Sequence, residues 1–492
     1  MSEINPKWQR DTLPIGGEWI TPSSSERITV ISPSTGQPVG SVPDSSPDDV
    51  GRAVAAAKAA FHSDAWSSLD GAGRADLLDR FAEEMMKREE DLVEAVTIAS
   101  GIPSSSTRYE TLPLLLAALA KFAQMARDEV VEQDRESALP LPVSARVRRV
   151  PLGVVAIIIP WNIPLLGAVT KLSEAWAAGC TTVFKPAPET PFDALIVAEI
   201  AEAAGFPAGV LNVVTGGVAS SQALVDNPDV NVVNFTGSTA TGRLIAQASA
   251  KHLRPCILEL GGNAASLVLD DAPMDEVVPG LVRMALALNN GEACIAQTRV
   301  LVTEKRKEEL VAGLAAAVTG IGVGDPFEPT TMVGPLISEK HRARVEDLIA
   351  SATAEGARLV AGGSRPEGLG EGYYLEPTVF ADVTNDMRIA REEIFGPVVT
   401  LITVADEDEA IRIANDTEYG LSHSVWSSDT EHGMEVARKL NAGSVWLNGS
   451  MVLDPNVPFG GWKASGYGRD GGLEGFHSYQ QTQALFQLAD MS

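Results

Sequence analysis

The sequence predicts an α/β fold, and two observations support this prediction. Short apolar segments alternate with helical segments over residues 150–260, and a second alternating series runs over residues 266–447. Short apolar strands that alternate with helices are typical of a parallel sheet that is covered by helices on both faces. We therefore predict a doubly wound, nucleotide-type domain at 150–260, followed by a second set of alternating elements.

The elements are predicted in the following order. Residues 48–128 are helical, because residues 50–61 are rich in alanine and residues 74–98 carry apolar side chains at three- and four-residue spacing. In the first series, strands are predicted at 153–159, 182–184, 211–214, 230–235 and 256–258, and helices at 165–178, 191–204, 220–225 and 239–250. In the second series, strands are predicted at 266–269 and 298–302 and helices at 274–289 and 304–318, and the series continues with the segments 342–355, 398–404, 407–415 and 444–447. The glycine-rich stretch 460–475 is predicted to be a loop.

Length and charge limit the classes of protein that fit the sequence. The 492 residues predict two to four domains. Lysine and arginine number 38 against 65 aspartate and glutamate, and the formal net charge of −27 argues against nucleic acid and anionic membranes as partners. The longest apolar runs fall far short of the roughly 20 residues that a membrane span needs.

Cysteine and histidine usage points to a reducing compartment. Cys180, Cys256 and Cys294 show no C-x-x-C spacing, and the six histidines form no H-E-x-x-H pair. The sequence therefore predicts neither a disulfide framework nor a metal site. Residues 1–20 lack the apolar core of a signal peptide, so we expect a cytoplasmic protein. Residues 141–150 alternate apolar and polar side chains, and with the C-terminal tail they are expected to form an edge that another subunit covers.

Cys294 is the candidate nucleophile, because a thiolate is the strongest nucleophile available at neutral pH. It follows a glycine turn in Asn-Asn-Gly-Glu-Ala-Cys, and a strand is predicted to begin four residues later. The other two cysteines are most simply buried apolar residues. A lone cysteine is more often structural than catalytic, so this interpretation depends on the groups that accompany it.

Other segments carry groups that are suited to chemistry. Glu259 ends a predicted strand, and Asn162 follows another strand in Pro-Trp-Asn-Ile-Pro, where its amide can donate hydrogen bonds. Lys185 ends a third strand, on the side where doubly wound sheets bind ligands. The glycine loop at 235–242 opens a helix whose N-terminus favours phosphate. Each feature alone is also compatible with an ordinary turn, cap or surface residue.

Taken together and in this order, these segments resemble the aldehyde dehydrogenase superfamily over nearly the whole chain. The matching motifs are PWNIP at 160–164, KPAPETP at 185–191, FTGSTATG at 235–242, ELGG at 259–262, NNGEAC at 289–294, EEIFGPV at 392–398 and PFGGWKASGYGR at 458–469. The resemblance implies two doubly wound (Rossmann-like) domains plus a small β oligomerisation element that gives homodimers or homotetramers. The implied boundaries are 1–128 with 150–261 for the cofactor-binding domain, 262–465 for the catalytic domain, and 129–149 with 466–492 for the oligomerisation element.

The resemblance also implies a role for each matching residue in the oxidation of an aldehyde to a carboxylic acid. Cys294 would attack the aldehyde carbonyl, and the Asn162 amide with the backbone N–H of Cys294 would stabilise the oxyanion. Hydride would pass to NAD or NADP, and Glu259 would act as the general base that hydrolyses the resulting thioester. Lys171 would help to position the site. The implied cofactor contacts are Ile158, Trp161, Lys185, Gly237, Ser238, Glu393 and Phe395.

The substrate pocket follows from position within the family. The implied lining residues are Ile163, Leu166, Thr170, Ile295, Met451, Leu453 and Phe459. None of them is basic, and they form no aromatic box for a quaternary ammonium group, so an uncharged aliphatic or aromatic aldehyde is expected. The alternatives are a semialdehyde dehydrogenase, a CoA-acylating dehydrogenase on the same fold, or a catalytically silent relative. Glu259 argues against CoA acylation, and retention of the thiol, carboxyl and amide argues against silence.

Three positions depart from the pattern that is common in the family. Pro188 stands where a glutamate usually binds the adenosine ribose, and Glu189 comes one residue later, which leaves the choice between NAD and NADP open. Glu292 replaces a glutamine two residues before the nucleophile, and if it is ionised near the thiol its charge would raise the pKa of that thiol. Asp470 replaces a glutamate of a proton relay, and its shorter reach leaves that relay in question.

Overall fold

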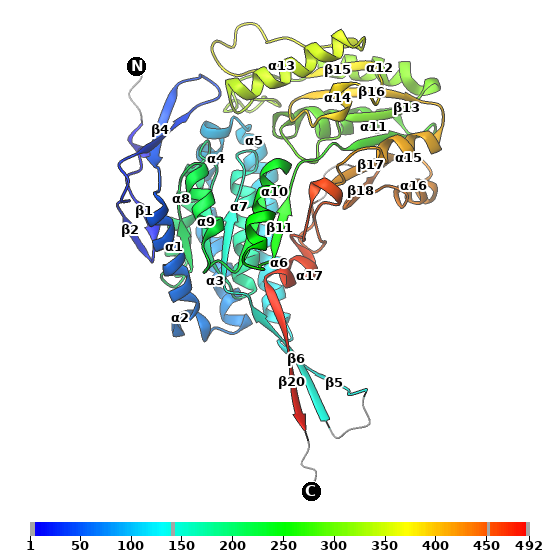
Figure 1. Ribbon diagram of the computed structural model, residues 1–492. Coiled ribbons are helices and arrows are strands. Elements are labelled where there is room, and N and C mark those ends of the chain that lie inside the picture. The colour runs from blue at the N-terminus through cyan, green and yellow to red at the C-terminus, as the bar shows by residue number, and fades with distance from the viewer. Residues whose placement is uncertain (1–4, 139–142, 450–452, 489–492) are drawn as a thin grey trace.

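Two large parallel sheets organise the protein, and a small third sheet projects from them (Figure 1). The computed structural model describes residues 5–138, 143–449 and 453–488. Separate apolar clusters cover the two faces of each large sheet. The α/β prediction, with doubly wound Rossmann-like sheets, is therefore confirmed. No helix in these described ranges is both long and apolar enough to span a membrane.

The first large sheet has the strand order β19-β11-β10-β7-β8-β9. Its strands are β7 (Val154–Ile158), β8 (Thr181–Lys185), β9 (Leu211–Val213), β10 (Val232–Thr236), β11 (Cys256–Glu259) and β19 (Gly466–Tyr467). All pair in parallel except β19, which runs antiparallel to β11. The connecting helices are α7 (Pro164–Ala177), α8 (Phe192–Ala203), α9 (Val218–Asp226) and α10 (Thr239–Ala250). Alternate residues of β7 pack on opposite faces, as the two-residue period of a strand requires.

The N-terminal segment packs against this sheet. It contains η1 (Pro6–Trp8), β1 (Leu13–Ile15), β2 (Glu18–Ile20), β3 (Arg27–Ile31) and β4 (Pro38–Pro43), followed by α1 (Pro47–Phe61), α2 (Asp64–Ser67), α3 (Gly71–Lys87), α4 (Glu89–Ser100), α5 (Ser104–Ser106), η2 (Thr107–Thr111) and α6 (Leu112–Asp128). The helical prediction for residues 48–128 is confirmed in outline. A capping box starts α1, in which the Ser46 hydroxyl and the Asp49 carboxylate each accept a hydrogen bond from the other residue's backbone N–H.

The second large sheet has the order β14-β15-β16-β13-β12-β17-β18. Its strands are β12 (Ala265–Val268), β13 (Arg299–Thr303), β14 (Arg358–Ala361), β15 (Thr378–Val383), β16 (Val398–Val404), β17 (Ser422–Trp426) and β18 (Ser444–Leu447). Only β14, at the edge, is antiparallel to its neighbour. The helices of this part are α11 (Met274–Leu281), α12 (Glu304–Val318), α13 (Glu339–Ala354), α14 (Arg388–Arg391), α15 (Glu407–Asn415) and α16 (Thr430–Ala437).

The third sheet forms a β arm at the end of the molecule where the C-terminus lies (Figure 1). It consists of β5 (Glu132–Arg135), β6 (Val143–Pro151) and β20 (Gln480–Leu488), and α17 (Gly472–Ser478) leads into it. The strand predicted over 141–150 and its pairing with the tail are confirmed for the described residues, because β20 pairs antiparallel with the whole of β6. Phe486 and Leu488 of β20 are 71% and 74% exposed.

The structure corrects two details of the prediction. The helix expected at 274–289 is α-helical only to Leu281, continues as the π-helical η3 (Val282–Ala287), and ends in the 3₁₀ turn η4 (Leu288–Gly291), where the backbone turns left-handed at Asn289. The stretch 460–475 is not all loop, since it contains η5 (Lys463–Ser465), β19 and the start of α17. β19, which stands at the start of the implied oligomerisation element, pairs antiparallel with β11 at the edge of the first large sheet.

Candidate active site

The segment that carries Cys294 and the turn that carries Asn162 hold each other in place. The side-chain amide of Asn162 donates a hydrogen bond to the Glu292 carbonyl at 2.7 Å, and the Asn289 amide donates one to the Asn162 carbonyl at 2.8 Å. The Asn162 side chain is buried, and both Asn162 and Cys294 line the same cavity. The predicted thiol and amide are therefore brought together by reciprocal hydrogen bonds between distant parts of the chain.

The local sequence explains the sharp turn before the thiol. Asn289, Asn290 and Gly291 all have left-handed backbone conformations, with φ of 45°, 60° and 76°. Asparagine and glycine are the residues that tolerate this region best. A Cβ at Gly291 would lie 2.3 Å from the carbonyl carbon of Gly396, so a larger residue has no room there. The Asn-Asn-Gly segment thus brings the cysteine segment into close contact with the loop that follows α14.

Glu259 is a buried carboxyl at the carboxyl end of β11. Only 3% of the residue is exposed, and neither carboxyl oxygen has a hydrogen-bond partner among the described residues. A Cβ at Gly460 would lie 2.8 Å from Oε1, so that glycine leaves room for the carboxyl group. Burial, with a contribution from the charge of Asp470, raises the pKa of Glu259 well above its usual range. A buried carboxyl with a raised pKa and no partner is typical of a general acid or base.

The Cys294 thiol lies partly exposed in the wall of the cavity. Burial raises the pKa of Cys294 to about 12, and the charges of Glu393 and Glu259 add to the effect. The condition under which Glu292 would raise this pKa, an ionised carboxylate beside the thiol, is not met. Its carboxyl group accepts a hydrogen bond from the Ile337 backbone N–H at 2.9 Å, and burial raises the pKa of Glu292 itself well above its usual range.

These charges predict how the free thiol responds to pH. Because the pKa of Cys294 is about 12, alkylation of the cofactor-free protein by iodoacetamide should accelerate about tenfold per pH unit from pH 7 to 10. Glu292→Gln should leave the profile unchanged, whereas Glu259→Gln should speed alkylation by removing a nearby negative charge. The modified residue is identified by peptide mass spectrometry. A plateau near pH 9, the behaviour of an ordinary cysteine, would contradict the assignment.

Lys171 of α7 belongs to a buried polar network beside Glu259. Its ammonium donates a hydrogen bond to Asn234 Oδ1 at 2.8 Å and forms an ion pair with Asp470. The Asn234 amide in turn donates to Asp470 Oδ1 at 2.8 Å and to the Tyr479 hydroxyl at 2.7 Å. Asp470 therefore reaches the lysine despite its short side chain, whereas the proton relay itself stays a prediction.

Four of the residues assigned to the cofactor lie at the carboxyl ends of strands in the first sheet. Ile158 ends β7, Lys185 ends β8, and Gly237 and Ser238 connect β10 to α10. Ser238 is the N-cap of α10, and its hydroxyl accepts a hydrogen bond from the Thr241 backbone N–H at 3.2 Å. This edge is where doubly wound sheets bind their ligands.

The other three residues assigned to the cofactor lie where segments from the two large sheets meet. Glu393 accepts a hydrogen bond from the Gly262 backbone N–H at 2.8 Å, and burial raises the pKa of Glu393 to about 7. The Phe395 carbonyl lies 2.6 Å from His341 Nε2. The Trp161 ring, which follows β7, packs edge-on against Phe395 and His341 with centroids 5.4 and 5.5 Å away. His341 was not predicted, because a single histidine at the start of a helix carries no recognisable signal.

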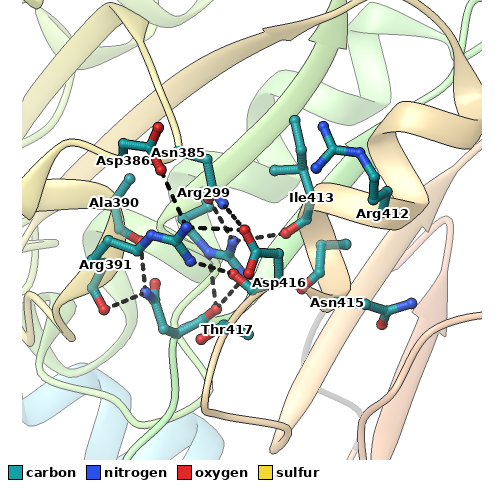
Figure 2. A network of polar contacts seen from close by, with 12 residues as sticks. Arg299, Asn385, Asp386, Ala390, Arg391, Arg412, Ile413, Asn415, Asp416 and Thr417 are labelled. Atoms are coloured by element: carbon teal, nitrogen blue, oxygen red, sulfur yellow. Dashed lines mark hydrogen bonds and ion pairs between the residues drawn. The ribbon is translucent and has the colours of Figure 1, made fainter.

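A polar network under this loop fixes its position (Figure 2). The guanidinium of Arg299, from β13, donates to the backbone carbonyls of Asn263 and Ile413. The Asn263 amide donates to the Ala390 carbonyl at 2.8 Å, and Arg391 pairs with Asp416 at 2.9 Å. Asn263 follows the strand that ends at Glu259, whereas Ala390 and Arg391 lie three and two residues before Glu393. The network therefore ties the turn after the buried carboxyl to the loop at 392–397.

The cavity beside Cys294 contains most of the predicted pocket residues. Five of the seven lie in its wall, namely Ile163, Leu166, Ile295, Leu453 and Phe459. The Thr170 side chain is not part of the wall, because its hydroxyl donates to the Leu166 carbonyl at 2.6 Å within α7. Met451 lies outside the described residues. The far wall comes from the N-terminal helices. The sequence did not predict these lining residues, because their pattern is that of ordinary core helices; they are Val96, Ile102, Ser106, Thr107, Glu110, Thr111 and Leu114.

The cavity is mostly apolar and carries little net charge. Glu110 is the one charged side chain among the lining residues that the structure describes, and it forms an ion pair with Arg283 at 3.1 Å. It lies in η2, a π-helical turn between α5 and α6. Single π turns in helices are frequent at functional sites. No periodicity in the sequence signals this turn, because it differs from an α-helix by one residue.

Fold and site together describe an α/β protein that has two Rossmann-like sheets and a cysteine in the wall of an apolar cavity. Residues 19–485 match the model of the aldehyde dehydrogenase family. The chain is 45% identical over 474 residues to the geranial dehydrogenase of Castellaniella defragrans. The aligned residues cover 96% of this chain and 98% of that protein. The chain belongs to the aldehyde dehydrogenase family, and it is an NAD(P)-dependent oxidoreductase that acts on an aldehyde, as predicted.

Solved structures agree with this assignment. An aldehyde dehydrogenase of Mycobacterium tuberculosis complexed with NAD+ superposes with a TM-score of 0.94 at 42% identity, covering 98% of this chain and 99% of that one. A mutant of aldehyde dehydrogenase C from Pseudomonas syringae, complexed with NAD+ and octanal, superposes with a TM-score of 0.93 at 38% identity. This superposition covers 99% of this chain and 98% of the Pseudomonas syringae chain.

Proposed function

We propose that this protein oxidises an uncharged aliphatic or aromatic aldehyde to the carboxylic acid through a covalent intermediate on Cys294. The observation that carries the proposal is that the thiol and the Asn162 amide line one apolar cavity, while the buried Glu259 lies near enough to affect the pKa of the thiol. The geranial dehydrogenase and the structure holding octanal support a substrate with an apolar body and no charge.

In the first half of the reaction Cys294 loses its thiol proton to solvent water, and the thiolate Sγ forms a bond with the aldehyde carbon. The carbonyl oxygen becomes an oxyanion, which accepts hydrogen bonds from the Cys294 backbone N–H and the Asn162 amide. One N–H of that amide bonds the Glu292 carbonyl, which leaves the second free for the oxyanion. Such preorganised donors typically contribute about 3–4 kcal/mol to transition-state stabilisation. Loss of hydride from the same carbon leaves a thioester on Cys294.

The second half hydrolyses the thioester. Glu259 accepts a proton from a water molecule, whose oxygen attacks the acyl carbon, and the Cys294 sulfur leaves. The unpaired, buried carboxyl is suited to this task because its raised pKa makes it a stronger base than an exposed glutamate. The charges of Asp470 and Lys171, which form an ion pair beside it, act on the pKa of Glu259 in opposite directions.

The residues at the strand ends fit a dinucleotide. When bound, NAD(P) supplies the hydride acceptor. Lys185 is buried at the end of β8, and its ammonium has a single hydrogen bond within the described ranges, to the Pro186 carbonyl at 2.8 Å, so donors remain for a ligand. Val218 and Leu244, on the packed helices α9 and α10, are 82% and 64% exposed and offer apolar surface to an adenine ring. Trp161, Glu393 and Phe395 would hold the nicotinamide end, with Ile158, Gly237 and Ser238 between.

The same proposal covers domain division, assembly and location. Residues 1–128 with 150–261 would form the cofactor-binding domain, and 262–465 the catalytic domain. The exposed apolar side chains of β20 and the full-length pairing of β20 with β6 support a role of the β arm in a homodimer or homotetramer. Three unpaired cysteines support a reducing, cytoplasmic location.

A screen of aldehydes tests the substrate class. Octanal, geranial and phenylacetaldehyde should give higher kcat/KM values than succinic semialdehyde or betaine aldehyde, because the cavity residues that the structure describes offer neither a free cation nor an aromatic cage for a charged group. Reduced cofactor is followed at 340 nm, and the product is identified with and without CoA. The highest kcat/KM for a charged aldehyde would contradict the substrate class, and an acyl-CoA product would contradict hydrolysis by Glu259.

A further inference from the structure

The carboxyl end of β8 places a buried lysine between two carboxylates. Lys185 is 3% exposed. Burial lowers the pKa of its ammonium to about 8, while the charges of Glu189 and Asp44 act in the opposite direction, so both carboxylates lie within electrostatic reach of it. Glu189 is close in sequence to this lysine, but Asp44 comes from the N-terminal segment. The two acids therefore meet at this strand end only in the folded protein.

Backbone contacts fix the position of Asp44. The Ser45 N–H donates to the Thr215 carbonyl at 2.9 Å, and the Ser220 hydroxyl donates to the Ser45 carbonyl at 2.8 Å. These bonds attach the segment before α1 to the turn that follows β9, the neighbour of β8 in the sheet. A Cβ at Gly216 would lie 3.0 Å from the Asp44 carboxylate. Asp44 thus stands at the carboxyl edge of the sheet, beside the strand end of Lys185.

Both carboxylates are available to a ligand. Glu189 is exposed in the turn before α8, and Asp44 is half-buried. Within the ranges that the structure describes, neither carboxylate accepts a hydrogen bond or lies within 4.0 Å of a basic nitrogen. Two negative groups against one ammonium leave the strand end with a net negative charge.

We infer that Asp44 and Glu189 together select NAD over NADP. The inference rests on the proposed dinucleotide site, with the adenosine ribose at Lys185. A free ribose 2′-hydroxyl can donate a hydrogen bond to a carboxylate, as acidic residues do in other dinucleotide sites. A 2′-phosphate carries a charge of about −1.5 to −2 and would meet two carboxylates that a single lysine does not neutralise. The pair thereby takes over the task of the glutamate that is absent at Pro188.

Binding of adenylate fragments tests the inference without turnover. Isothermal titration calorimetry would compare 5′-AMP with adenosine 2′,5′-bisphosphate on the wild-type protein, on Asp44→Asn, on Glu189→Gln and on the double variant. The wild type should favour 5′-AMP at least about tenfold, each single variant should lower the ratio about three- to tenfold, and the double variant should lower it further. The ratio of kcat/KM for NAD and NADP should follow the same order.

A matched control removes a carboxylate elsewhere. Glu83→Gln, in the exposed face of α3, changes the net charge equally and should leave both ratios unchanged. Thermal melting confirms that each variant is folded. Equal wild-type affinity for the two fragments, or an unchanged ratio in the double variant, would overturn the inference while leaving the proposed function intact. A shift in only one single variant would overturn the joint assignment. If neither fragment binds the folded wild type and neither dinucleotide is reduced, the proposed dinucleotide site itself fails.

Discussion

Replacing Cys294 by alanine should lower kcat for aldehyde oxidation by about 10⁴-fold or more, because no other group can form the covalent intermediate. The remaining thiols cannot substitute for it. Cys180 is fully buried and burial raises its pKa to about 11, and Cys256 is buried within β11. The measurement is the rate of absorbance change at 340 nm with an aliphatic aldehyde and saturating cofactor.

Cys256→Ala is the matched control for this variant. It removes a thiol of the same size from the first sheet, away from the cavity, and should keep most of the activity. Incubation of the wild type with aldehyde and cofactor, followed by rapid acid quenching, should yield an acyl adduct on the peptide that contains Cys294. A Cys294→Ala protein that turns over at the parental rate would remove the nucleophile assignment.

Replacing Glu259 by glutamine should lower the steady-state rate about 10²–10⁴-fold, the usual contribution of a general base. Glutamine keeps the shape of the side chain in the space that Gly460 leaves for it, so the fold should be preserved. The first half of the reaction does not need the base for water, and the loss of a negative charge near Cys294 favours its thiolate. Stopped-flow absorbance should therefore show a burst of about one equivalent of reduced cofactor, followed by a slow phase.

The slow phase identifies the step that Glu259 serves. Intact-protein mass spectrometry should detect the thioester accumulating on the variant, and hydroxylamine, which attacks a thioester without a base, should restore turnover. Loss of the burst together with the steady state would contradict a role limited to hydrolysis. Lys171→Met provides a comparison, because it alters the network beside the carboxyl without removing the carboxyl itself.

The alternating pattern predicted the two doubly wound sheets because it follows from the hydrophobic periodicity within each short segment. The apolar segment that forms β7 is buried on both faces, and a strand of this kind can be recognised from a few consecutive apolar residues. The position of Cys294 after Asn-Asn-Gly was also visible, since that run suits the left-handed backbone of the turn. By contrast, no local pattern predicted the π turn at Thr107–Thr111 or the helical start at Gly472.

The candidate site divides in the same way. The sequence motifs were sufficient to nominate Cys294, Glu259 and Asn162, but the direction of each side chain depends on long-range contacts. Glu292 looked like a neighbour of the thiol, and it turns toward Ile337 because a backbone N–H there satisfies its buried carboxylate. Asp470 looked too short, and it reaches Lys171 because the turn before α17 lies close to α7.

By itself, the sequence determined the fold class, the chemical groups and the strand ends on which they stand, since these follow from hydrophobic period and turn chemistry within a few residues. The tertiary structure alone decided which residues surround each group. It set the far wall of the cavity, the ion pair of Glu110 with Arg283, and the approach of Asp44 to Lys185. Electrostatic interactions and burial depend on distance in space, and residues more than a hundred positions apart become neighbours only when the chain has folded.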